Sequence, residues 1–392
     1  MNEKRNIRLM YAVAALQGMV FYAPVATLYR QAQGVSLFEI ALIESVSLAL
    51  MIVLEIPWGM VTDRIGYKKT LVACNVLYFV SKLVFWKASG FLWFLCERLL
   101  LSVVLAGLSG CDTAYLFVLG KGQNSHRLFG LYSAMSTAGV LFASAVFSLL
   151  IKDDYPLGGL LTAASYGVSM LLSLALQDVR PEEAPRAGVL ERVRETACAL
   201  RQQARFLLFL FAAALLIQTG QTITVFFSQP QYIRSGILPE HMGYLHILVT
   251  IAGLFSAKTG ALTRRMGESA ATKLLFLLAG AACAVGALSE TPLPSVASIL
   301  LIRLCSSLFE PIHMARQNLQ VSSGGRAAML SAYSSMMNIA AIFTNLLFGR
   351  ASEIHIGYAF ALGTVFCLFG FALYAVWEKR AKSRPRKSDK PL

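Results

Sequence analysis

Charged residues are scarce in this chain, and the sequence motifs of soluble enzymes are missing from it. Only 14% of the 392 residues are charged, 56% are hydrophobic, and the mean hydropathy is +0.61. These values lie outside the range of soluble domains. There is no phosphate-binding Gly-x-x-x-x-Gly-Lys-Ser/Thr loop, no Gly-x-Ser-x-Gly element, and no Cys or His pair at metal-ligand spacing. We therefore expect a membrane protein that is not an enzyme and that uses neither a cofactor nor a metal.

Cysteine is also sparse, and its placement argues against disulfide bonds. All of the seven Cys lie in apolar runs except Cys198, which lies in a charged loop. None falls in the loops expected on the oxidising side of a membrane. We expect the thiols to stay reduced.

Long apolar runs, by contrast, recur along the whole chain. A helix of roughly 20 apolar residues crosses the hydrocarbon core of a bilayer. The sequence predicts an all-α membrane protein with twelve transmembrane helices. The predicted spans are 8–29, 37–61, 70–87, 91–119, 128–151, 156–177, 206–232, 240–263, 270–288, 294–317, 328–350 and 356–377.

The net charge of +14 is distributed unevenly between the loops. If the N-terminus is cytoplasmic, the inner segments carry 26 of the 35 Lys and Arg residues and the outer loops carry five. This asymmetry follows the positive-inside rule and predicts that both termini are cytoplasmic. The excess charge thus has a topological cause, and we expect no nucleic-acid partner. The first run is too long for a signal peptide and lacks a clear cleavage site, so it is interpreted as a retained helix.

One long loop separates six spans from six. It contains two prolines and then Leu190, Val193, Ala197 and Leu200 at helical spacing among arginines. This pattern indicates a hinge and an amphipathic helix on the anionic inner leaflet, and a solvated linker helix is the alternative. The predicted domains are a six-helix bundle over 1–178, a linker over 179–205, a second six-helix bundle over 206–378 and a basic tail over 379–392.

The two halves resemble each other in sequence. At a shift of 201 residues, Gly59, Thr62, Arg64 and Gly66 map onto Gly260, Thr263, Arg265 and Gly267, and Gln17 maps onto Gln218. At a shift of 205, Arg98 maps onto Arg303. Collinear matches of this kind predict a duplicated, pseudo-symmetric six-helix unit.

The stretch GMVTDRIGYKK, between the second and third spans, resembles the signature of the major facilitator superfamily. The matching residues are Gly59, Asp63, Arg64, Gly66, Lys68 and Lys69. A solvated turn that only marks topology is the simpler reading of an Asp-Arg pair, but six matched positions favour the family. The resemblance implies two six-helix bundles and alternating access. It also implies a conformational latch made of these residues with Asp112 and Glu55. In the second copy Arg264 replaces Asp63, so no equal latch is expected there.

Polar side chains inside apolar spans indicate where a solute pathway lies, because a charge facing lipid is costly. Arg303, Ser307 and Glu310 share one helical face of the tenth span, and Pro24 and Pro230 interrupt corresponding spans of the two halves. Polar residues that only tie helices together are the alternative. Arg98 and Arg303 each need a counter-charge, and the nearest candidates in the sequence are Glu97, Asp112 and Glu310. No role is assigned to Lys82. The candidate substrate-binding residues are Gln17, Tyr22, Arg98, Gln218, Thr222, Arg303 and Asn338, and the candidate proton-coupling residues are Glu310 and Glu44.

Without an ATP site, an ion gradient is the expected energy source. The leading hypothesis is proton-coupled export of a small amphipathic organic compound, because Gly18, Pro24 and Val25 partly resemble an element of drug exporters. The first alternative is uptake or exchange of an anionic solute held by Arg98 and Arg303. The second is a sensor or lipid-handling protein on the same scaffold. The expected partners are a small-molecule substrate, protons and membrane lipids. We expect a monomer in a bacterial inner (plasma) membrane.

Overall fold

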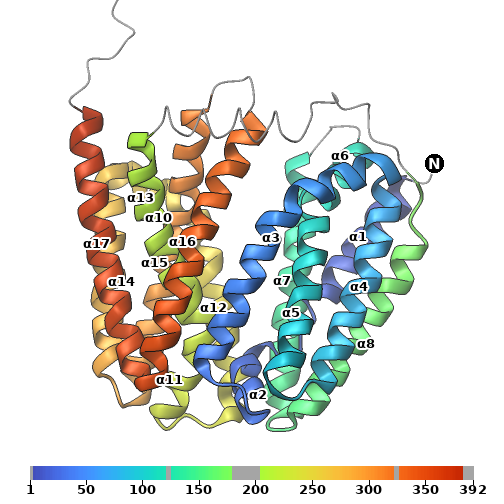
Figure 1. The fold of residues 1–392 in the computed structure, drawn as a ribbon, viewed down its shortest axis with the longest axis horizontal. Coiled ribbons are helices and arrows are strands. Elements are labelled where there is room, and N and C mark those ends of the chain that lie inside the picture. Colours follow the sequence, from blue (N-terminus) through green and yellow to red (C-terminus); the bar gives the residue numbers. More distant parts are fainter. Residues whose placement is uncertain (1–2, 121–124, 179–203, 322–325, 383–392) are drawn as a thin grey trace, which may run out of the picture. The chain divides into compact units, whose positions relative to one another are not determined.

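The computed structural model describes residues 3–120, 125–178, 204–321 and 326–382, and all secondary-structure elements in this part of the chain are helices (Figure 1). The predicted amphipathic helix of the linker lies outside the described residues, as does most of the basic tail. The predicted division into domains stays a prediction.

Eleven helical segments of the described chain are long and apolar enough to cross a membrane. This confirms an all-α, multi-pass membrane protein. The remaining predicted run, 328–350, forms the 29-residue helix α16 (Arg326–Ile354). The total of twelve spans and the side of the termini stay predictions. The eleven segments are Glu3–Ala32, Leu37–Leu54, Tyr67–Lys87, Gly90–Leu119, Arg127–Ile151, Tyr155–Leu174, Arg205–Arg234, Pro239–Met266, Glu268–Leu288, Pro292–Gln320 and Ile356–Ala381.

The chain divides into two compact units, which are described separately. Unit 1 comprises Met1–Ala187 and Gln229–Ile251. In it, α1 packs against α7 and α8, while α4 packs against α5 and α8. Its elements are α1 (Glu3–Gly18), η1 (Ala23–Val25), α2 (Ala26–Ala32), α3 (Leu37–Ile65), α4 (Tyr67–Lys87), α5 (Gly90–Leu108), α6 (Cys111–Leu119), α7 (Ser125–Val146), the π-helical η2 (Phe147–Ile151), α8 (Tyr155–Leu174), η4 (Pro239–His241) and most of α11 (Ser228–Arg234) and α12 (Met242–Leu254).

Unit 2 comprises Gly188–Ser228 and Ala252–Leu392. Here α14 packs against α15 and α17, and α10 packs against α16 and α17. The core is aromatic, with Phe209, Phe276, Phe309 and Tyr374 buried among these helices. The elements of unit 2 besides α16 are α10 (Ala204–Thr222), the π-helical η3 (Ile223–Phe227), η5 (Phe255–Lys258), α13 (Thr259–Met266), α14 (Glu268–Leu288), α15 (Pro292–Gln320) and α17 (Ile356–Lys382).

The backbone repeats the same turn in both units. Gly66 ends α3 with φ 88° and ψ 160°, and its N–H donates to the carbonyl of Thr62 at 3.0 Å. Gly267 ends α13 with φ 80° and ψ 150°, and its N–H donates to the carbonyl of Thr263 at 2.9 Å. Only glycine adopts this conformation without strain. The shared geometry agrees with the repeat inferred from a shift of 201 residues.

The two spans that contain Pro24 and Pro230 are interrupted, as their sequences predict. The first changes from α1 to the short η1 around Pro24, and the seventh passes through the π-helical η3 shortly before Pro230. Irregular backbone at membrane depth needs hydrogen-bond partners. At the start of α2 the N–H groups of Thr27 and Leu28 donate to Oε1 of Gln229, at 2.8 and 3.3 Å. The break is therefore capped by a side chain within unit 1.

Candidate functional site

Two ion pairs lie inside the membrane-spanning helices of unit 1. Nζ of Lys82 on α4 lies 3.3 Å from Oε1 of Glu97 on α5, and these side chains are 5% and 1% exposed. Nη2 of Arg98 on α5 lies 2.6 Å from Oε1 of Glu44 on α3, with side chains 20% and 14% exposed. The neighbouring residues 97 and 98 thus face different helices. We call Glu44, Lys82, Glu97 and Arg98 the charged cluster.

Lys82 is held by aromatic side chains as well as by Glu97. Its ammonium donates to the hydroxyl of Tyr22 at 3.1 Å and lies 5.3, 5.6 and 5.8 Å from the ring centroids of Tyr78, Tyr166 and Tyr22. Ring quadrupoles attract a cation, and such contacts help to offset the loss of its hydration. The sequence did offer a signal for this residue: a lysine in an apolar run needs a carboxylate, and Glu97 lies in the next run.

The charged cluster retains unused hydrogen-bonding capacity. Among the described residues, neither Oε2 of Glu97 nor Nε of Arg98 has a hydrogen-bond partner, although both atoms are buried. Arg30 interacts electrostatically with Glu97 and Glu44, and its guanidinium lies 5.3 Å from the ring centroid of Phe85. With Arg30 included, three cations face two carboxylates. An anion would therefore balance the charge of this region.

The counter-charge predicted for Arg98 from the sequence was wrong. Glu97, Asp112 and Glu310 were its expected candidates, but Glu44 forms the ion pair and Glu97 binds Lys82. Residues 97 and 98 diverge around the helix, so one partner cannot serve both side chains.

Gln17 and Tyr22 both contact other residues of unit 1. Nε2 of Gln17 donates to Oδ1 of Asn75 at 3.0 Å, and the Gln17 carbonyl accepts from the hydroxyl of Tyr166 at 2.6 Å. The ring of Tyr22 stacks on Phe85 with the ring centroids 3.8 Å apart. These contacts place Tyr22 beside the charged cluster and Gln17 in a polar network between α1, α4 and α8. A role of either residue in substrate binding stays a prediction.

In unit 2, Arg303 lies against a glycine and keeps unused polar atoms nearby. A Cβ atom at Gly253 would lie only 2.7 Å from Nη2 of Arg303, so a larger residue there would displace the guanidinium. Nε of Arg303 and Oγ of Ser307 are buried and have no hydrogen-bond partner within the described residues. The side chain of Glu310 is exposed, and no ion pair joins it to Arg303 in the described part of the chain. The expectation that Arg98 and Arg303 together hold one anionic solute stays a prediction, because they belong to different units.

The remaining candidates of unit 2 lie on α10 and α16. The hydroxyl of Thr222, only 2% exposed, donates to Oδ1 of Asn345 at 2.9 Å and so ties the two helices together. Gln218 and Asn338 are partly buried. Their predicted binding roles are not tested by this placement.

The residues of the predicted latch are only partly described. The side chains of Glu55 and Asp63 and the surroundings of Gly59 lie outside what the structure describes. Arg64 and Lys69 are exposed, and Lys68 is partly exposed. Asp112 lies in the first turn of α6, where its Oδ1 accepts from the N–H of Thr113 at 2.7 Å. The latch stays a prediction.

The helices α3, α4 and α5 bury two ion pairs within membrane-spanning segments. This arrangement is that of a multi-pass membrane protein with polar side chains between its helices. The sequence profile of the Major Facilitator Superfamily matches residues 9–315. The chain belongs to this superfamily, as the Gly59–Lys69 stretch predicted. The family and its relatives are transporters rather than enzymes, which confirms that prediction as well.

Two curated relatives match part of the chain. The L-fucose-proton symporter of Escherichia coli (strain K12) is 24% identical over 131 residues, which cover 33% of this chain and 30% of the symporter. An uncharacterised transporter of the superfamily from Methanocaldococcus jannaschii is 28% identical over 153 residues, which cover 39% of this chain and 36% of that protein. The matches thus span about a third of these relatives.

Solved structures match almost the whole chain. The nucleoside transporter NupG superposes with a TM-score of 0.79 at 16% identity and covers 98% of this chain and 100% of its own. A bacterial homolog of the human lysosomal transporter Spinster gives a TM-score of 0.72 at 15% identity, with 98% and 99% covered. At such low identity the likeness shows the fold alone.

Proposed function

We propose that this protein is a secondary active transporter with twelve transmembrane helices that moves a small organic anion together with protons by alternating access. The observation that carries this proposal is the Arg98–Glu44 ion pair, which is partly accessible within a region that has an excess of positive charge. Membership of the superfamily supports the transport mechanism.

The Arg98–Glu44 pair provides a way to couple a proton to an anion. A guanidinium presents a planar fork of N–H donors that matches a carboxylate or phosphate. While Glu44 is ionised, it occupies that fork at 2.6 Å. Protonation of Glu44 removes its charge and releases Arg98 for a substrate anion. Proton and substrate then bind in cooperation, as symport requires. A relative named as a proton symporter supports this form of coupling.

The Lys82–Glu97 pair has a positioning role in this scheme. Both side chains are almost fully buried, and Tyr22 binds the ammonium, so this pair fixes α4 against α5. Because Glu97 and Arg98 are adjacent on α5, the pair also fixes the direction in which Arg98 points.

A second candidate keeps proton coupling at Glu310 and the export of an amphipathic compound. It is favoured by the exposed carboxylate of Glu310 on α15, the helix that also carries Arg303. In that case the proton and the substrate compete for binding instead of cooperating.

The two candidates are separated by flux into proteoliposomes under an imposed pH gradient. We expect accumulation of members of a panel of carboxylates and sugar phosphates, and none of cationic dyes. Glu44→Gln should abolish pH-driven accumulation and retain downhill exchange, because the amide mimics a protonated carboxyl. Glu353→Gln, at an exposed surface pair with Arg350, is the matched control and should behave as wild type. Accumulation of dyes, or loss of coupling in Glu310→Gln but not in Glu44→Gln, contradicts the proposal.

A further inference from the structure

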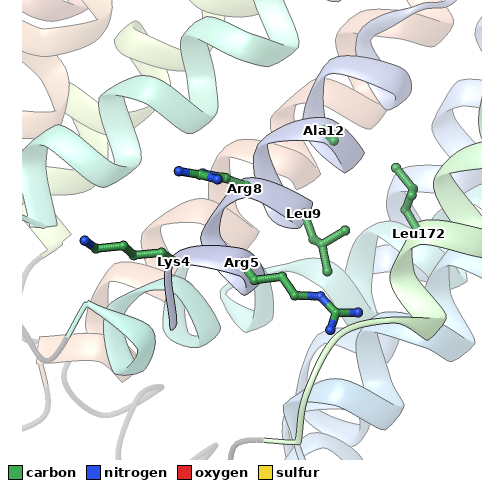
Figure 2. A pocket seen from close by; sticks show the side chains of 6 residues that line it. All are labelled: Lys4, Arg5, Arg8, Leu9, Ala12 and Leu172. Atoms are coloured by element: carbon green, nitrogen blue, oxygen red, sulfur yellow. The ribbon is translucent and has the colours of Figure 1, made fainter. Parts of the chain in front are cut away.

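A basic pocket lies at the beginning of α1, apart from the charged cluster. It has a volume of about 530 Å³ and is lined by Lys4, Arg5, Arg8, Leu9 and Ala12 of α1 and by Leu172 of α8 (Figure 2). The lining contains three cations and no carboxylate. Lys4 and Arg8 are four residues apart, so their charges lie on one helical face and repel each other.

The other half of the lining is apolar and continues along both helices. On α1, Leu9, Ala12 and Leu16 follow one another at helical spacing, and each is partly exposed. On α8, Val168 lies one turn from Leu172 and is 47% exposed. These residues belong to segments that are apolar enough to cross a membrane. The pocket therefore presents cations at one end and continues into a lipid-compatible surface at the other.

We propose that this pocket binds an anionic phospholipid. The phosphate of the headgroup contacts Arg5, whose side chain points to the same side of α1 as Leu9 and Leu172, and an acyl chain lies along Leu9, Ala12 and Leu172 (Figure 2). The phosphate accepts charge-assisted hydrogen bonds from Arg5 and lowers the repulsion among the three cations of the lining. Basic residues next to the apolar part of a membrane helix favour the binding of anionic lipid. Inorganic phosphate shares the headgroup chemistry but lacks the chain that the apolar half would hold.

The test measures which lipid stays bound to the purified full-length protein after reconstitution into equal amounts of phosphatidylglycerol and phosphatidylcholine and extraction with mild detergent. Native mass spectrometry should find phosphatidylglycerol retained in preference to phosphatidylcholine. In Arg5→Gln/Arg8→Gln this retention should fall about tenfold or more. Arg264→Gln/Arg265→Gln removes the same charge at exposed positions outside the pocket, and its retention should match wild type.

A third variant separates a lipid from a free anion. Ala12→Phe fills the apolar half of the pocket and leaves the cations in place, so it should reduce lipid retention as well. Excess inorganic phosphate should displace little lipid from the wild-type protein. If lipid retention fell equally in the pocket variant and the control variant, the lipid would be held by the general positive charge of the protein. If phosphate displaced all of the bound lipid, the pocket would be a site for a free anion. Either result overturns the proposal.

Discussion

The Lys82–Glu97 pair is the residue-level feature with the largest expected effect on stability. Removing one partner leaves the other as an uncompensated buried charge, which costs about 3–5 kcal/mol. We expect Lys82→Met and Glu97→Gln each to lower the melting temperature in detergent clearly. The double variant Lys82→Met/Glu97→Gln should recover most of that loss, because no charge remains unpaired. A double variant as unstable as the sum of the two single variants would show that the pair is not coupled.

Gly139 allows a very close approach of α1 and α7 in unit 1. A Cβ atom there would fall far inside van der Waals distance of the backbone carbonyl of Ala15, so α1 and α7 would have to separate. Gly139→Ala should therefore destabilise the protein by several kcal/mol, on the order of an overpacked core site. Gly130→Ala on the same helix meets nothing within 4 Å and is the control. Since alanine is the better helix former, that variant should unfold at an equal or higher temperature. Equal melting temperatures for the two variants would contradict the close packing.

At the scale of the elements, the paired turns at Gly66 and Gly267 predict equal effects in both repeats. Nothing lies within 4 Å of a Cβ atom at Gly267, and the nearest atom at Gly66 is 3.6 Å away, so the cost of a side chain is backbone strain alone. Gly66→Ala and Gly267→Ala should each destabilise by about 1–3 kcal/mol. Thermal unfolding in detergent measures both. A marked effect at one site only would show that the two turns are not equivalent.

Most of the helices could be predicted from the sequence, because hydrophobic runs report membrane spans directly. The predicted run 37–61 corresponds to α3, and 356–377 corresponds to α17. The break of the fourth run into α5 and α6 was missed. It depends on the left-handed conformation of Gly110, with φ 79°, inside a run that is uniformly apolar.

The candidate site was predicted less completely than the helices. Sequence spacing places residues on a helical face but does not choose a partner helix. For that reason Arg98 and Glu44 were found as single residues and their ion pair was not, and the role of Lys82 was missed.

For the whole molecule, the latch at Asp63 predicts a change in transport without a change in binding. Asp63→Asn removes a charge in the last turn of α3, far along that helix from Glu44 of the charged cluster. We expect slower transport in proteoliposomes and nearly unchanged substrate affinity in detergent, because the latch biases the equilibrium between conformations. Arg265→Gln, in the repeat that lacks the Asp, should transport at the wild-type rate. A large loss of affinity in Asp63→Asn would assign this residue to the binding site instead.

The two asparagines inside α16, Asn338 and Asn345, bear on how the chain enters the bilayer during synthesis. A translocon admits each emerging segment largely by that segment's own apolarity, so these amide side chains oppose the insertion of α16 on its own. The Thr222 hydroxyl on α10, synthesised earlier, gives Asn345 a partner inside the membrane. Insertion of α16 would then depend on helices already in place. Asn345→Leu should raise insertion of α16 as an isolated segment, measured by glycosylation mapping in microsomes, yet lower the melting temperature of the finished protein. The side chain that hinders entry into the membrane would thus be one that holds the completed bundle together.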